Sequence, residues 1–278
     1  MMSKTRKIEA VLWKFLVKLA AVLTMAVLLF IVIYILIKGI PNLSLGLFSL
    51  HYTTDNQSIV PSLLHTIELT LMGLLLAVPL GIFAAVFMNE YAKKGSKLVA
   101  LTSITSETLT GIPSIVYGLF GLLFFVEACH LRKTLLAGAL TIAIMVLPTI
   151  LRTTQEALMA VPDTFREASY GLGAGKLRTV FKVILPTAMP GILSGIILAI
   201  GRIVGESAAL IYTAGTITDK YAGPLDSGRT LAVHMYLLSN EGLYTDQAYA
   251  TAVVLLVLVL LLNLGSKAVA DRITKERN

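Results

Sequence analysis

The sequence predicts an all-α membrane protein with six transmembrane helices and both termini in the cytoplasm. Two observations predict this fold class. The chain of 278 residues is 56% hydrophobic and only 14% charged, whereas a typical soluble domain has about 25% charged residues. Its apolar residues also gather in runs that carry little charge and approach the length of about 20 residues that a helix needs to cross a bilayer.

The first span is predicted at 19–37, a run without charge, glycine or proline that follows a basic N-terminal segment. A secretory signal peptide is the alternative, but its apolar region is only about 7–15 residues long and ends at an A-x-A site, which is absent here. We therefore expect a retained helix. The other spans are predicted at 66–88, 109–128, 134–151, 189–213 and 248–266.

The distribution of Lys and Arg predicts the orientation. With the N-terminus inside, 17 of the 23 basic residues fall in cytoplasmic segments, five fall in outer segments, and Arg202 lies inside a span. This bias follows the positive-inside rule. The net charge of +7 is then a consequence of topology, and no nucleic-acid partner is expected. We expect one transmembrane domain over 1–278, with its core at about 60–266.

A polar insert at 152–188 separates the fourth and fifth spans. Thr164 and Glu167 have the spacing of a capping box, in which each side chain satisfies a free amide at a helix start. A short helix is expected at about 165–172, ended by the glycines of 171–175. An amphipathic segment would follow and end at Pro186. A short helix between two breaks would transmit a push from a soluble partner to the spans.

The same insert resembles a known loop. Glu167-Ala168-Ser169, with Gly173 six residues after Glu167 and Leu185-Pro186 at the end, is similar to the Glu-Ala-Ala ("EAA") loop of ABC importer membrane subunits of the type I, MetI-like fold. The resemblance implies that Glu167, Ala168, Gly173, Leu185 and Pro186 contact a separate ATPase. Ser169 replaces the second alanine and Val183 replaces an isoleucine of the family pattern, and both changes leave this docking interpretation intact.

A nucleotide-binding loop of the chain's own is not expected. The Gly175-Lys176 pair invites that interpretation, but Tyr170 stands where the first glycine of a P-loop belongs and Leu177 follows the lysine. The resemblance to ABC importer membrane subunits implies a transporter subunit that is not an enzyme, with ATP hydrolysis on the partner ATPase.

Further stretches between about 60 and 215 resemble the PstA type of phosphate permease. They are 61–63 with 66–70, 78–82, 89–92, Gly111 to Gly121 (Gly-Ile-Pro-Ser-Ile-Val-Tyr-Gly-Leu-Phe-Gly), 147–152 and Gly201 to Ala208 (Gly-Arg-Ile-Val-Gly-Glu-Ser-Ala). The resemblance implies a subunit of an ATP-driven importer of inorganic phosphate in a bacterial inner membrane. It also implies these partners: a PstC-like second permease, an ATPase dimer, an extracytoplasmic phosphate-binding protein and a phosphate-sensing regulatory protein.

Arg202 and Glu206 are the candidate substrate-pathway residues. They are four positions apart in the fifth span and are expected on one helix face, where an ionised side chain costs about 2.5–3.5 kcal/mol on insertion scales. Either they neutralise each other as a structural ion pair, or Arg202 binds the anion in transit while Glu206 weakens its grip. Glu68, near the outer end of the second span, is a third candidate.

Small residues and the rival functions complete the prediction. Two Gly-x-x-x-Gly pairs, Gly191 with Gly195 and Gly201 with Gly205, are expected to admit another helix. A permease for another oxyanion or small solute is the first rival. An intramembrane enzyme would have to use Ser207, which has no nearby histidine, and a passive channel leaves the cytoplasmic insert unexplained. No catalytic residue, metal ligand or cofactor is expected.

Overall fold

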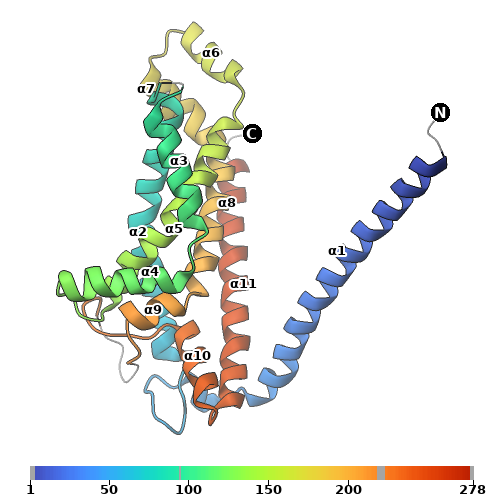
Figure 1. The fold of residues 1–278 in the computed structure, drawn as a ribbon. Helices are drawn as coiled ribbons and strands as arrows, with labels where there is room; N and C mark the ends of the chain where they lie inside the picture. The colour runs from blue at the N-terminus through green and yellow to red at the C-terminus, as the bar shows by residue number, and fades with distance from the viewer. Residues whose placement is uncertain (1–3, 94, 218–222, 276–278) are drawn as a thin grey trace.

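The computed structural model describes residues 4–93, 95–217 and 223–275. Lys94, Lys220 and Arg277, which enter the charge balance above, lie outside these ranges. Within them every regular element is a helix (Figure 1). The α-helices are α1 (Lys4–Gly39), α2 (Val60–Val86), α3 (Lys97–Thr110), α4 (Ser114–Gly121), α5 (Leu135–Met159), α6 (Asp163–Gly171), α7 (Lys176–Thr179), α8 (Leu185–Val204), α9 (Ala208–Thr213), α10 (Leu231–Glu241) and α11 (Thr245–Lys275). The 3₁₀ turns η1 (Ile40–Asn42) and η2 (Leu45–Phe48) follow α1, and the π-helical turns η3 (Phe87–Tyr91), η4 (Leu122–Ala128) and η5 (Val180–Ile184) extend α2, α4 and α7.

The membrane-spanning helices agree with the predicted fold class. In the described part of the chain, five helices are long and apolar enough to cross a membrane, and a bent pair makes up to six. Most helices exceed the predicted spans, because polar residues at the bilayer surface continue the helix. The fourth predicted span, for example, ends at 151, whereas α5 continues to Met159.

The predicted continuous third span at 109–128 is wrong. The chain bends by 103° between α3 and the helix that starts at Ser114, so α3 runs along the bundle and α4 lies across it (Figure 1). Pro113, at the N-cap of α4, fixes its own backbone and disfavours helix at the residue before it. The Tyr117 hydroxyl donates a hydrogen bond to the Leu109 carbonyl at 2.8 Å and thereby ties the two helices together across the bend.

The fifth predicted span differs from the structure at both ends. Pro186 does not end the amphipathic segment, because helix continues from Lys176 to Val204 and Pro190 lies inside α8. A π-helical turn comes just before Pro186, and proline is tolerated where the helical hydrogen-bond pattern changes. At the other end the helix stops at Val204, and α9 starts as a separate element at Ala208.

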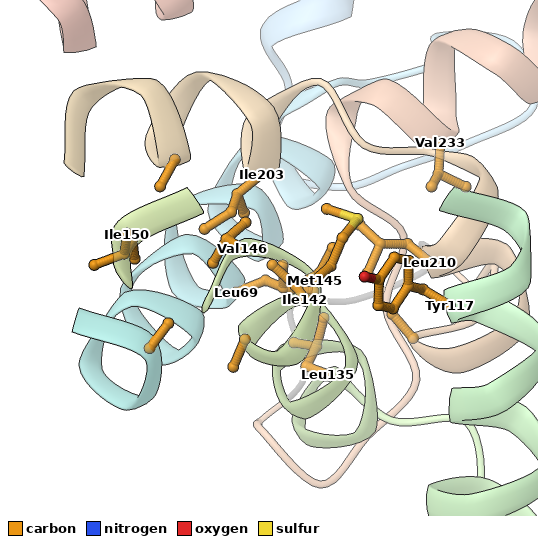
Figure 2. Close-up of a cluster of buried hydrophobic side chains, with 14 residues drawn as sticks. Leu69, Tyr117, Leu135, Ile142, Met145, Val146, Ile150, Ile203, Leu210 and Val233 are labelled. Carbon is orange, nitrogen blue, oxygen red and sulfur yellow. The ribbon is translucent and has the colours of Figure 1, made fainter. Parts of the chain in front are cut away.

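The main hydrophobic core lies where α2, α5, α8 and α9 meet. Leu69, Ile142, Ile203 and Leu210 are buried in one cluster there, and Figure 2 shows their side chains converging on Met145. Of the two glycine pairs, only the first has its predicted role in this chain. A Cβ at Gly191 would lie 2.6 Å from the Cβ of Ala157, and Gly195 meets Thr153 in the same way, whereas Gly201 has no such neighbour within 4 Å.

Helix α1 stands apart from the bundle and meets it only near its end, at α11 (Figure 1). There Tyr34 packs edge-on against Tyr249, with ring centroids 5.9 Å apart. Figure 1 also places both ends of the chain and α6 at the same end of the molecule, as an N-in, C-in topology requires. The opposite end contains α10, which lies between the predicted fifth and sixth spans.

Candidate functional site

Arg202 lies in the last turn of α8 and is half-buried. Glu206 is only 9% exposed and lies beyond the end of that helix. Its carboxylate accepts a hydrogen bond from the backbone N–H of Ala209 at 3.1 Å and so caps α9. Among the described residues Arg202 takes part in no ion pair. The predicted shared helix face is therefore wrong, because the helix ends between the two residues, and their expected ion pair does not form.

The Gly111–Gly121 stretch, which resembles PstA, packs against α9. A Cβ at Gly118 of α4 would lie 2.8 Å from the Cα of Ala209, and one at Gly121 would lie 2.6 Å from a methyl carbon of Thr213. The small residues of α4 thus let α9 approach to backbone contact. Tyr117, on the same turn as Gly118, lies within electrostatic range of Arg202. The helix that follows the break after Arg202 is therefore held against α4.

A cavity of ≈ 580 Å³ borders this break. Ser207 contributes to its wall, and the rest comes from the end of α1 and from α10 and α11. The cavity thus adjoins the interrupted backbone at Ser207, whereas Arg202 and Glu206 do not contribute to its wall. In a membrane, interrupted backbone is tolerated next to a cavity because the freed polar groups are satisfied there.

Glu68, the third predicted pathway residue, lies in the third turn of α2 and is half-buried. One of its carboxylate oxygens is buried and has no hydrogen-bond partner. Its neighbours Leu69 and Thr70 belong to the buried face of α2. No ion pair in the described part of the chain joins Glu68 to Arg202.

The short helix of the insert begins at Asp163, with Pro162 at its N-cap. The predicted capping box is wrong, because Thr164 lies inside the helix and no side chain caps its start. Proline preceding the first turn already fixes the entry of the chain. Glu167 and Ala168 are exposed. Glu167 is therefore not needed to cap this helix and presents its carboxylate to the solvent.

Arg166 is the residue of this region that sequence reasoning missed. Its guanidinium pairs with Glu90 in η3, the turn that extends α2, with Nη2 and Oε1 2.6 Å apart, and the two side chains are only 15% and 5% exposed. It also donates to the carbonyls of Leu158, in the last turn of α5, and Val161, just after α5. The hydrogen bond with Glu90 raises the pKa of Arg166. The resemblance of 89–92 to a PstA segment was the only signal, and it did not indicate a partner.

The glycine-rich turn after α6 is shaped by two features. Gly173 has a φ of +81°, and a Cβ at this position would meet no other atom within 4 Å. The positive φ is therefore the reason for this glycine, and close packing is not. Ser169 is buried, and its hydroxyl lies 2.8 Å from that of Thr179. The residue that departs from the EAA pattern thus joins α6 to α7.

Apolar side chains cover the outside of this turn. Leu172 is 89% exposed and lies between α6 and α7, and Leu177 is 68% exposed and lies in the first turn of the helix that continues to Val204. Leu185, by contrast, packs with Ala85 and Leu158 in a second hydrophobic cluster, and Pro186 is half-buried beside it. The two ends of the predicted docking loop therefore differ, since one faces outward and the other anchors α8.

A model of the family described as "Binding-protein-dependent transport system inner membrane component" matches residues 77–276. A probable ABC transporter permease of Bacillus subtilis, YqgI, is 34% identical over 93% of this chain and 94% of its own length. The phosphate transport system permease protein PstA of Yersinia pestis is 32% identical over 91% of this chain and 89% of its own.

Solved structures share the fold. A chain of a bacterial alginate ABC transporter superposes with a TM-score of 0.72 at 17% identity, over 98% of both chains. A chain of the MetNI methionine ABC transporter in an inward facing conformation gives 0.60 at 22% identity, over 77% of this chain and 94% of that one. The chain belongs to the family of inner membrane components of binding-protein-dependent transport systems, as a multi-pass permease of the PstA type with the MetI-like fold.

Proposed function

We propose that this chain, acting as one unit over 1–278, is one of two membrane subunits of an ATP-driven importer of inorganic phosphate. The observation that carries the proposal is the helix break after Arg202. The half-buried Arg202 guanidinium has no carboxylate partner in the described part of the chain, and Ser207, beyond the break, borders a cavity. A planar guanidinium binds oxyanions through paired hydrogen bonds. The relatives named PstA make phosphate the anion to test first.

The ATP chemistry takes place on a partner. The exposed Glu167 carboxylate and the apolar side chains of Leu172 and Leu177 form the surface for an ATPase subunit, and Ala168 and Gly173 shape it. The complete importer then contains two ATPase subunits, a PstC-like permease that completes the pathway, and an extracytoplasmic binding protein that delivers phosphate. A contact with a phosphate-sensing regulatory protein would use the same cytoplasmic end.

The coupling route follows from the contacts of α6. A displacement of α6 by the ATPase reaches α2 through the Arg166–Glu90 pair and the end of α5 through the carbonyls of Leu158 and Val161. Both helices pack against α8 in the main core. Movement of α8 against α9 at the break then changes the access of Arg202 to either side of the membrane.

The test is uptake of radiolabelled phosphate by vesicles that contain the reconstituted permease pair, ATPase and binding protein. We expect uptake only with ATP and the phosphate-loaded binding protein. The alternative is an importer of another oxyanion. Uptake of sulfate, molybdate or arsenate, each supplied with its own loaded binding protein, tests this alternative. ATP-dependent uptake of one of these without uptake of phosphate would reject the proposed substrate and keep the transporter class.

A further inference from the structure

Arg229 is a buried cation that the proposed pathway leaves unused. It directly precedes Thr230, the N-cap of α10, and α10 lies at the end of the molecule opposite α6 (Figure 1). Only 6% of the residue is exposed. Its backbone is fixed, because its N–H donates to the Ile217 carbonyl at 3.0 Å and its carbonyl lies 3.3 Å from Nδ1 of His65.

The guanidinium of Arg229 has no ionic partner in the described part of the chain. Its Nε and Nη2 atoms are buried and have no hydrogen-bond partner. The group lies over the ring of Tyr52, with Cζ 4.9 Å from the ring centroid, and this contact holds the cation without using its N–H donors. A buried charged group without hydrogen bonds is costly, so a structural role alone does not account for it.

Glu68 and His234 also carry buried polar atoms without a hydrogen-bond partner in the described residues. In the described residues, five buried side-chain polar atoms have no hydrogen-bond partner, and four of them belong to Arg229, Glu68 and His234. Glu68 lies within electrostatic range of His65, which contacts the Arg229 carbonyl. Burial, and next the charge of Arg229, lower the pKa of His234 to about 3, so this imidazole is neutral and adds no second cation.

The free donors of Arg229 and the free acceptor of Glu68 together indicate which class of ligand would fit. Arg229 offers N–H donors and requires acceptor oxygens, whereas the free Glu68 oxygen requires a donor. Inorganic phosphate near neutral pH satisfies both, because it carries acceptor oxygens and at least one P–OH group. Sulfate carries no proton at that pH, and its oxygens would be repelled by the Glu68 carboxylate.

We infer that Arg229 and Glu68 form an outer receiving site for a protonated oxyanion, which holds phosphate on the extracytoplasmic side before it reaches Arg202. This inference rests on the proposed function and adds to it a second anion site and a means of rejecting sulfate within the permease.

The test measures binding of radiolabelled phosphate to the assembled permease–ATPase complex in lipid nanodiscs, without binding protein. All variants carry Arg202→Gln, so that only the outer site is measured. We expect Arg229→Gln to weaken phosphate binding about 10- to 100-fold, as for the loss of hydrogen bonds to a charged group. Arg132→Gln, at an exposed outer arginine, is the matched control and should leave binding unchanged. Glu68→Gln should let sulfate compete with phosphate at least about tenfold better.

Several results would overturn the inference. The first is the absence of phosphate binding in the Arg202→Gln complex. The second is equal phosphate binding with and without Arg229→Gln. The third is sulfate competition of the same strength with and without Glu68→Gln. Loss of the second permease from the complex, with phosphate affinity unchanged, would instead make Arg229 a contact for a partner's carboxylate. If Arg229→Gln fails to assemble, Arg229→Lys keeps the charge but loses the paired donors, and normal phosphate binding by that variant would also reject the site. Uptake by the unmodified complex tests the proposed function separately, since it can succeed when the outer site fails.

Discussion

The arginines at the two ends of the molecule differ in whether they have ionic partners. At the end that carries α6, the buried arginine is fully engaged, since Arg166 pairs with Glu90 and donates to two backbone carbonyls. Toward the other end, Arg202 and Arg229 have no ionic partner in the described part of the chain. An engaged cation fixes helices to one another, whereas an unengaged cation remains available to a ligand. The contrast assigns a mechanical role to the first end and an anion-handling role to the second.

The largest expected effect on stability comes from breaking the engaged pair. Arg166→Ala leaves Glu90 buried without a partner, and the loss of one member of a buried pair typically costs about 3–5 kcal/mol. Asp163→Asn removes a contact to the same guanidinium, but the Asp163 side chain is 83% exposed, so we expect a change within about 0.5 kcal/mol. Thermal unfolding of the purified subunit in detergent measures both. Equal stability of the two variants would remove the mechanical role of the pair.

Substitutions at Arg202 should affect transport and leave stability intact. Arg202→Lys keeps the charge but loses the paired donors, and we expect phosphate uptake to fall at least about tenfold with the complex still assembled. The exchange Arg202→Glu with Glu206→Arg should also abolish uptake, because Glu206 caps α9 and does not pair with Arg202. Arg152→Lys, at an exposed arginine at the opposite end, is the matched control. Near-normal uptake in Arg202→Lys and in the exchange would exclude an anion-binding role.

The turn after α6 should depend on backbone conformation at one glycine. Gly173→Ala forces a side chain into a φ of +81° and should destabilise the turn by about 1–2 kcal/mol, and Gly173→Asp should act at least as strongly. Gly175 has a φ of −73° and equally open surroundings, so Gly175→Ala is the control. We expect phosphate-coupled ATP hydrolysis to fall only in the Gly173 variants, with normal insertion in the membrane. Identical hydrolysis in all variants would argue against this turn as the ATPase contact.

The smallest expected effect concerns the hydroxyl pair that joins α6 to α7. Ser169→Ala and Thr179→Val each remove one member of a buried hydrogen bond, worth about 1 kcal/mol. The double variant should cost less than the sum of the two single variants, because the second change removes a group that has already lost its partner. Unfolding of the four proteins in detergent provides this comparison. Additive costs would mean that the two hydroxyls do not stabilise each other.

Hydropathy and local spacing predicted the parts of the fold that depend on nearest neighbours. The spans follow from apolar runs, and the turn after α6 follows from its glycines, so both agree with the structure. The bend at Pro113 and the break after Val204 interrupt the helical backbone within stretches of sequence that stay apolar. Hydropathy therefore did not reveal them. The capping box at Thr164 failed because Pro162 sets the start of α6 two residues earlier.

The candidate site was only partly predictable for a related reason. Arg202 and Glu206 could be singled out because charge inside a span is expensive. Their separation could not be predicted, because it depends on the helix ending between them. Glu90, which pairs with Arg166, and Tyr52, which packs against Arg229, lie far from these arginines in the sequence, and a single sequence contains no signal that joins residue 166 to residue 90.

The isolation of α1 has a consequence for how the protein is made. Its aromatic contact, between Tyr34 and Tyr249, joins α1 to a helix that is synthesised much later. At a synthesis rate of about 5–20 residues per second, α1 waits on the order of 10–40 s for that partner. An apolar helix with all its backbone hydrogen bonds made within itself can wait in lipid without cost. Helix α1 can therefore insert in the membrane early and attach to the bundle only after α11 has been synthesised.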